Sequence, residues 1–183
     1  MKRQVMTALA GGVIALAVSA SDVSAAQTAA ELSAAVQKTI ANCYQTVQTC
    51  KEFGNKASGM LVFPEVTKAA IGVGGEYGEG ALVVGGKPAG FYSTSAASIG
   101  LQLGAEQRSQ IIMFMTDEAL KKFQASDGWE IGGKAGVTVI DTGMSGKIDT
   151  TSFNEPVVGY IFGEKGLMAD LSFEGQKISK IQR

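Results

Sequence analysis

Glycine placement is the feature that most constrains the fold of this chain. The 183 residues include 24 glycines and three prolines, and the glycines separate short apolar segments without a collagen-like period. Glycine permits tight turns, bulges and close approaches between backbones. The pattern therefore predicts a β-rich fold with many turns, and a chain of this length is typical of one folding unit.

Short apolar runs bounded by turn residues predict about eight strands. Gly85-Gly86 separates a glycine-spaced segment over 69–84 from a return over 89–92, which predicts a hairpin. The continuous apolar run from Ile111 to Met115 is expected to be buried on both faces of the sheet. The other runs are 60–63, expected to end at Pro64, and 99–103, 129–140, 157–162, 167–173 and 177–181.

An amphipathic helix is predicted from about residue 27 to 47, because apolar residues recur there at three- and four-residue intervals. Its polar face carries one lysine, Lys38, so packing against the domain is favoured over a position on a membrane surface. That possible membrane contact remains the alternative for this apolar face, which consists of Leu32, Val36 and Ile40, continued by Cys43 and Val47.

A second, short helix is predicted after Thr116, a good N-cap residue, and Ser126-Asp127-Gly128 should end it. The fold class expected from these patterns is α+β. It consists of a glycine-rich antiparallel curved sheet or barrel-like core of about eight strands, an N-terminal amphipathic helix, and one short helix between strands.

Residues 1–25 have the features of a secretory signal peptide. Lys2 and Arg3 precede a small apolar run over 5–20, and cleavage is expected after Ala25, with Ala20 as the alternative. A transmembrane anchor is the other interpretation, but the run is short for a bilayer of ~30 Å. Since no cysteine stands at either cleavage position, we expect an exported protein, periplasmic or peripheral to a membrane, and not a lipoprotein.

Composition argues against most familiar catalytic chemistry. The chain has no histidine and a net charge of −1. Without imidazole, Ser-His-Asp and Cys-His catalysis and the usual metal ligand are excluded. The near-neutral charge gives no attraction to nucleic acid. We expect no catalytic residues, no metal and no cofactor.

Two motifs that resemble sites are interpreted as structural. Asp141-Thr142-Gly143 resembles the aspartic protease tripeptide, but the second Asp-Thr, at Asp149, lacks the glycine, so a turn is favoured. The glycine run over 72–80 stands between strands, whereas a phosphate-binding loop opens a helix. Glu76 and Glu79 within that run should point to opposite faces of a strand.

Cys43 and Cys50 are expected to form a disulfide, because an exported chain meets an oxidising compartment. In an unbroken helix the two Cα atoms would lie roughly 10 Å apart, beyond the reach of a disulfide. The bond therefore requires a break in the helix near residues 46–49, where β-branched residues weaken it.

The chain resembles the SYLF domain family over residues 57–181. The resemblance rests on motifs taken together and in order: residues 59–69 (GMLVFPEVTKA), 74–80 (GGEYGEG), 91–94 (FYST), 99–105 (IGLQLGA), 114–117 (FMTD) and 166–175 (GLMADLSFEG). It implies that residues 26–56 form an N-terminal helical segment joined in one unit to a SYLF-like β-rich domain over 57–183.

The resemblance also implies binding to a lipid or membrane surface without catalysis. Eukaryotic relatives bind phosphoinositides through an N-terminal amphipathic helix and basic residues, and some act on actin. The corresponding residues here are Leu32, Val36 and Ile40 of the helix, with Lys68, Arg108, Lys121, Lys122 and Lys165 as basic candidates. We expect a phospholipid or membrane surface as the partner and no actin. The alternative is a structural or protein-interaction module of the cell envelope, with a protein partner there.

Overall fold

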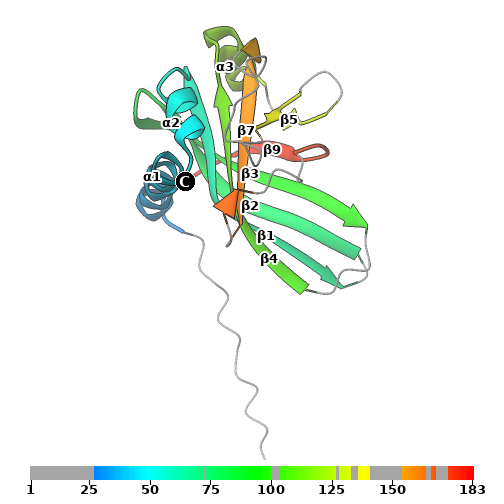
Figure 1. Ribbon diagram of the computed structural model, residues 1–183. Helices are drawn as coiled ribbons and strands as arrows, with labels where there is room; N and C mark the ends of the chain where they lie inside the picture. The colour runs from blue at the N-terminus through cyan, green and yellow to red at the C-terminus, as the bar shows by residue number, and fades with distance from the viewer. Residues whose placement is uncertain are drawn as a thin grey trace, which may run out of the picture.

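The fold is built around one curled, half-barrel sheet, and helices lie against it (Figure 1). The computed structural model describes residues 27–71, 73–99, 104–126, 128–132, 136–140, 154–163, 166–167 and 173–183. The predicted signal peptide and the Asp141-Thr142-Gly143 motif lie outside these residues. In chain order the elements are α1 (Ala29–Thr46), α2 (Gln48–Gly54), β1 (Gly59–Ile71), β2 (Val73–Val84), β3 (Lys87–Ile99), β4 (Gly104–Phe114), α3 (Asp117–Gln124), β5 (Trp129–Glu130), β6 (Thr138–Val139), β7 (Val157–Gly163), β8 (Gly166–Leu167) and β9 (Lys177–Ile181).

The strand order is β5-β9-β3-β2-β1-β4-β7-β6, and β8 pairs with β7 outside this path. Every pair is antiparallel except β6 with β7, which is parallel. The expected α+β class, with a curved sheet of about eight strands, an N-terminal helix and a short helix between strands, is confirmed. The segment over 129–140, expected as one strand, instead gives β5 and β6 at opposite edges. Gly132, with φ 139°, follows β5.

Strand β1 does not end at Pro64, as expected, but continues through it. Its register against β2 and β4 shifts at this point, after Val62 in one pairing and after Phe63 in the other, which marks a β-bulge. A bulge tolerates proline because its residues leave the regular hydrogen-bond ladder. The carbonyl of Pro64 accepts a hydrogen bond from the Ser109 hydroxyl of β4 (2.6 Å).

The hairpin predicted at Gly85-Gly86 is confirmed, and both glycines have positive φ (58° and 78°), as a tight two-residue turn requires. A second reversal was not foreseen. Residues 69–71 end β1 and pair with residues 73–75 of β2, so the segment over 69–84 spans two antiparallel strands. No proline, asparagine or aspartate marks that reversal.

Each face of the sheet carries its own apolar core. On the face that we call the helix side, Val62, Val83 and Met113 pack with side chains of α1 and α2. On the opposite face, the α3 side, Leu61, Leu82 and Ile112 pack with α3 and with residues around β5 and β9. The run from Ile111 to Phe114 is fully buried on both faces, as its continuous apolar sequence predicts.

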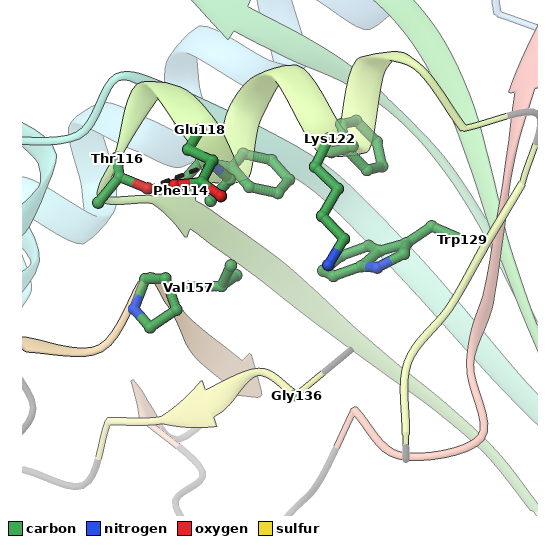
Figure 2. Close-up of a pocket in the computed structure, with 10 residues that line it drawn as sticks. Phe114, Thr116, Glu118, Lys122, Trp129, Gly136 and Val157 are labelled. Carbon is green, nitrogen blue, oxygen red and sulfur yellow. Dashed lines mark hydrogen bonds between the residues drawn. The ribbon is translucent and has the colours of Figure 1, made fainter. Parts of the chain in front are cut away.

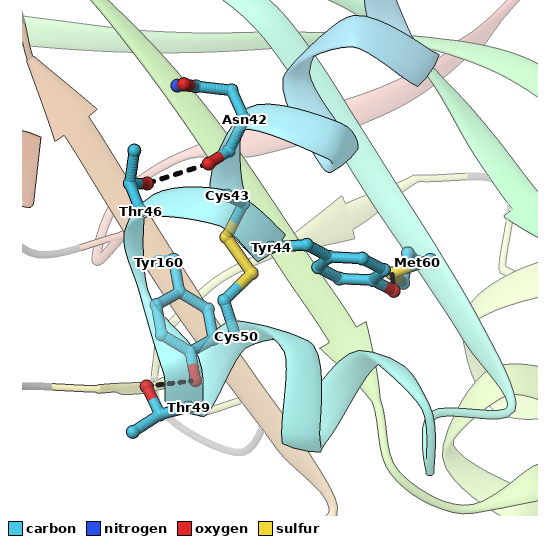
Figure 3. Close-up of a disulfide and its surroundings, with 8 residues drawn as sticks. All are labelled: Asn42, Cys43, Tyr44, Thr46, Thr49, Cys50, Met60 and Tyr160. Atoms are coloured by element: carbon cyan, nitrogen blue, oxygen red, sulfur yellow. Dashed lines mark hydrogen bonds between the residues drawn. A yellow bond between two sulfur atoms is a disulfide. The ribbon is translucent and has the colours of Figure 1, made fainter.

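Helix α1 begins with a capping box, in which Thr28 and Glu31 each bind the other's backbone N–H. It ends at Thr46, and Val47 is extended (φ −132°, ψ 106°) before α2 begins. This break allows the predicted disulfide between Cys43 and Cys50, whose Cα atoms lie 6.0 Å apart (Figure 3). The disulfide is thus present, at the junction of the two helices.

The α2 side of this junction is fixed to the sheet by Tyr160 of β7. Its hydroxyl donates a hydrogen bond to Thr49 (3.1 Å), and its ring packs edge-on against Phe53 (Figure 3). Burial raises the pKa of Tyr160 to about 12, because the phenolate would lose its hydration.

Tyr160 should make the stability fall at high pH. In the unfolded chain a tyrosine loses its proton near pH 10, whereas folded Tyr160 keeps it up to about pH 12. The stabilisation is complete below pH 10. Between pH 10 and 12 it is lost, and the free energy of unfolding falls by on the order of 2 kcal/mol. Urea unfolding at pH 9 and pH 11.5 should show this loss, and it should shrink in Tyr160→Phe. An equal loss in that variant would assign it to other groups.

Among the described residues, no helix combines the length and the apolar character needed to cross a membrane.

Candidate functional site

A cleft of about 380 Å³ opens between α3, the end of β4 and the start of β7 (Figure 2). We call it the α3 cleft. Its lining combines ring and aliphatic side chains with a few polar groups: Phe114, Thr116, Glu118, Ala119, Lys122, Phe123, Trp129, Gly136, Pro156 and Val157.

Three aromatic rings build one wall of the α3 cleft. Phe114, the last residue of β4, stacks on Phe123 of α3 with ring centroids 4.8 Å apart. Trp129 meets both rings, at 5.4 Å from Phe123 and 5.8 Å from Phe114. Such contacts fix the rings. Phe114 and Phe123 are buried beneath the wall, and Trp129 is the ring that is partly exposed at the cleft. Trp129 is also the chain's single tryptophan.

The position of α3 follows from its sequence. The Thr116 hydroxyl accepts a hydrogen bond from the Ala119 backbone N–H (3.1 Å), which caps the helix, as predicted. Leu120 and Phe123 are buried against the α3 side of the sheet. The opposite helix face is exposed, and from its edge Lys122 reaches over the cleft towards Trp129 (Figure 2). The site thus pairs an apolar wall with one ammonium group.

The apolar face of α1 lies elsewhere. Leu32, Val36 and Ile40 are 1%, 0% and 7% exposed, and Val36 and Ile40 pack in the helix-side core. Packing against the domain, the favoured interpretation of this helix, is what the structure shows. Lipid contact through the same three residues would require α1 to leave the sheet, and it stays a prediction.

The basic candidates are not gathered in one patch. Arg108 is buried on the α3 side of β4, where it forms an ion pair with Glu76, and Lys68 lies 3.9 Å from the same carboxylate. Lys121 and Lys122 are exposed on α3, and of the four basic candidates that the structure describes, Lys122 is the one that lines the α3 cleft. The fifth, Lys165, lies outside the described residues. A role of Lys68 or Arg108 in lipid binding stays a prediction.

The aromatic part of the cleft was missed at the sequence level. The cleft combines residues from three separate segments, Phe114, Trp129 and Val157, and each of them taken alone is typical of a strand. One sequence feature could have indicated this cleft: the single tryptophan follows closely after a helix that carries an exposed pair of lysines. No group of three or more acidic or cysteine side chains within the described ranges is arranged to hold a metal ion.

The chain is thus an α+β half-barrel with an aromatic cleft beside a lysine. Residues 95–183, from the second half of β3 onward, match the family model Ysc84, whose description is "Las17-binding protein actin regulator". Ysc84 is the family model of the SYLF domain, so the resemblance is confirmed over residues 95–183. The motifs before residue 95 lie outside the match. The curated proteins include no significant match to the chain.

Proposed function

We propose that this chain is a non-enzymatic lipid-binding protein of the cell envelope, and that the α3 cleft is its lipid site. The observation that carries the proposal is the aromatic wall of the cleft, with Lys122 at its rim. An acyl chain would lie against Trp129, which the buried rings of Phe114 and Phe123 support, and the Lys122 ammonium would meet the phosphate of the headgroup.

The family match supports a binding module and leaves its ligand open. Its description names actin regulation, so the expectation that actin is not a partner of this chain has no support from the match and stays a prediction. The envelope location rests on the sequence of residues 1–25. An exported chain would meet membrane phospholipid directly, which favours a lipid as the ligand.

The experiment that tests the proposal uses Trp129 as a built-in probe. Protein from residue 26 onward is mixed with vesicles of anionic or zwitterionic phospholipid that carry doxyl labels on their acyl chains. Entry of an acyl chain into the cleft should quench the tryptophan fluorescence, while unlabelled vesicles should not. Co-sedimentation without quenching would place the contact elsewhere, and absence of both signals would contradict lipid binding.

Replacing Lys122 with glutamate should weaken binding to anionic vesicles by roughly 30-fold. A lysine near an anionic membrane contributes about 1 kcal/mol, and reversal of the charge adds a repulsion of similar size. The loss should be smaller at high salt, because ions screen the interaction. Lys51→Glu, on the exposed surface of α2 across the sheet, makes the same change in net charge and serves as the control. An equal loss in both variants would refute a specific role of Lys122.

The alternative function is an envelope interaction module without a lipid ligand. The partner named in the family description favours it, since that partner is a protein. Failure of the protein to bind vesicles of any composition, together with recovery of one envelope protein in pull-downs, would support this alternative over lipid binding.

A further inference from the structure

The long strands β1 to β4 extend beyond the part of the sheet that α1 covers (Figure 1). On the helix side of this extension lies a row of polar side chains. Tyr77 of β2 stands opposite Thr67 of β1, and Thr67 stands opposite Gln107 of β4. Adjacent members are separated by one strand spacing, about 5 Å. We call Tyr77, Thr67 and Gln107, with the neighbouring Glu79 and Glu65, the polar row.

Tyr77 presents an aromatic ring to solvent and is held in place. It is 53% exposed, and it is the exposed large hydrophobic residue of the described chain. Its hydroxyl donates a hydrogen bond to Glu79 (2.8 Å), which also forms an ion pair with Arg183. The ring is therefore oriented before any ligand arrives.

The other end of the row is equally organised. One carboxylate oxygen of Glu65 accepts hydrogen bonds from the Gln107 amide (3.0 Å) and the Thr67 hydroxyl (3.4 Å). These side chains form a fixed array of donors and acceptors on the sheet surface, so little side-chain entropy remains to be lost on binding.

A groove of about 310 Å³ continues the polar row towards α1. It is lined by Lys38 and Asn42 of α1 and by Ser109 of β4, among others. Ser109 lies two residues from Gln107 on the same face of β4, about 7 Å away. The row and the groove thus form one continuous surface, with an aromatic ring at one end and a concave polar end at the other.

The chemistry of this surface points to a sugar polymer. A pyranose ring has an apolar face that packs on an aromatic ring, and hydroxyls that bind carboxylate, amide and hydroxyl groups. The charges along the surface nearly balance, since Lys38, Arg183 and Lys177, which stands opposite Ser95 next to Tyr77, face Glu65 and Glu79. A surface with so little net charge suits an uncharged polar chain better than a strongly charged ligand. We propose that a linear β-linked polysaccharide binds here, stacked on Tyr77 and extending into the groove.

The test is co-sedimentation of the full chain with insoluble chitin and cellulose. We expect binding to at least one of them that changes little between low and high salt, a loss of at least tenfold in Tyr77→Ala, and a change of no more than a few-fold in Tyr77→Phe, which keeps the ring. Because Tyr77 is exposed, its replacement should leave Trp129 fluorescence and the unfolding transition unchanged. Absence of binding to both polymers, binding abolished by salt, or full binding by Tyr77→Ala would overturn the proposal.

This surface and the α3 cleft lie on opposite sides of the sheet, so their functions can be separated. Lys122→Glu should keep polysaccharide binding, and Tyr77→Ala should keep vesicle binding. Loss of polysaccharide binding in Lys122→Glu would also overturn the assignment to the polar row, whatever the outcome with lipid.

Discussion

Gly80→Ala is expected to lower the free energy of unfolding by at least about 3 kcal/mol, the upper range for overpacking a buried site. Gly80 lies on β2 against the bulge of β1. A Cβ atom there would overlap the carbonyl oxygen of Val62 and lie 2.7 Å from the ring of Phe63. Both obstacles belong to a buried part of β1, and one of them is a backbone oxygen, so the backbone itself would have to move. Urea unfolding measures the effect.

Gly75→Ala is the matched control, because Gly75 lies on the same strand and is exposed. A Cβ atom at Gly75 would meet its nearest neighbour, the carbonyl oxygen of Ala96, at 3.7 Å, an ordinary contact. Its free energy of unfolding should stay within about 0.5 kcal/mol of the original. Similar free energies of unfolding for the two alanine variants would show that the close approach at the bulge does not exclude a side chain at position 80.

Removal of the disulfide in the double variant Cys43→Ala, Cys50→Ala should cost about 2 kcal/mol. The bond closes a short loop, with a sequence separation of 7, and restricts the unfolded chain accordingly. For a chain of this size the melting temperature should fall by roughly 4 to 8 °C. Because both cysteines are buried in the helix-side core, the loss should act on the packing of α1 and α2 against the sheet.

Thermal unfolding of the original protein, oxidised and after reduction with dithiothreitol, gives the comparison for this double variant. The reduced protein should melt close to the variant, and the reductant should not change the variant itself. A control at Gln45, an exposed residue of the same helix, should leave the oxidised melting temperature almost unchanged when replaced by serine. Equal melting temperatures before and after reduction would contradict a stabilising role of the bond.

The fold could be predicted where local chemistry determines it. The apolar spacing of α1, the N-cap at Thr116 and the glycines at 85 and 86 each act over a few residues, and each prediction is confirmed. The disulfide could be predicted as well, because a helix cannot bring Cys43 and Cys50 together without the break that Val47 provides.

Predictions failed where the deciding contact is remote. Pro64 looks like the end of a strand, but the bulge and the hydrogen bond from Ser109 accommodate it within β1. The candidate sites depend on the same kind of remote contact. Lys122 was selected from the sequence, whereas Trp129 and Val157 join it only when the sheet brings distant segments together. The spacing of these residues along the chain does not indicate that they lie close together in the fold.

The pairing of β3 with β9 has a consequence for the rate of folding. Phe91 of β3 is matched with Ile181 of β9, and Tyr160 reaches Thr49 across a sequence separation of 111. Such contacts have a high contact order, so the search for them is slow. Until β9 docks, β3 exposes an unpaired edge that can recruit another copy of the chain. The slowest step in refolding is therefore expected to coincide with the greatest tendency to aggregate, and dilution should favour recovery of the native protein.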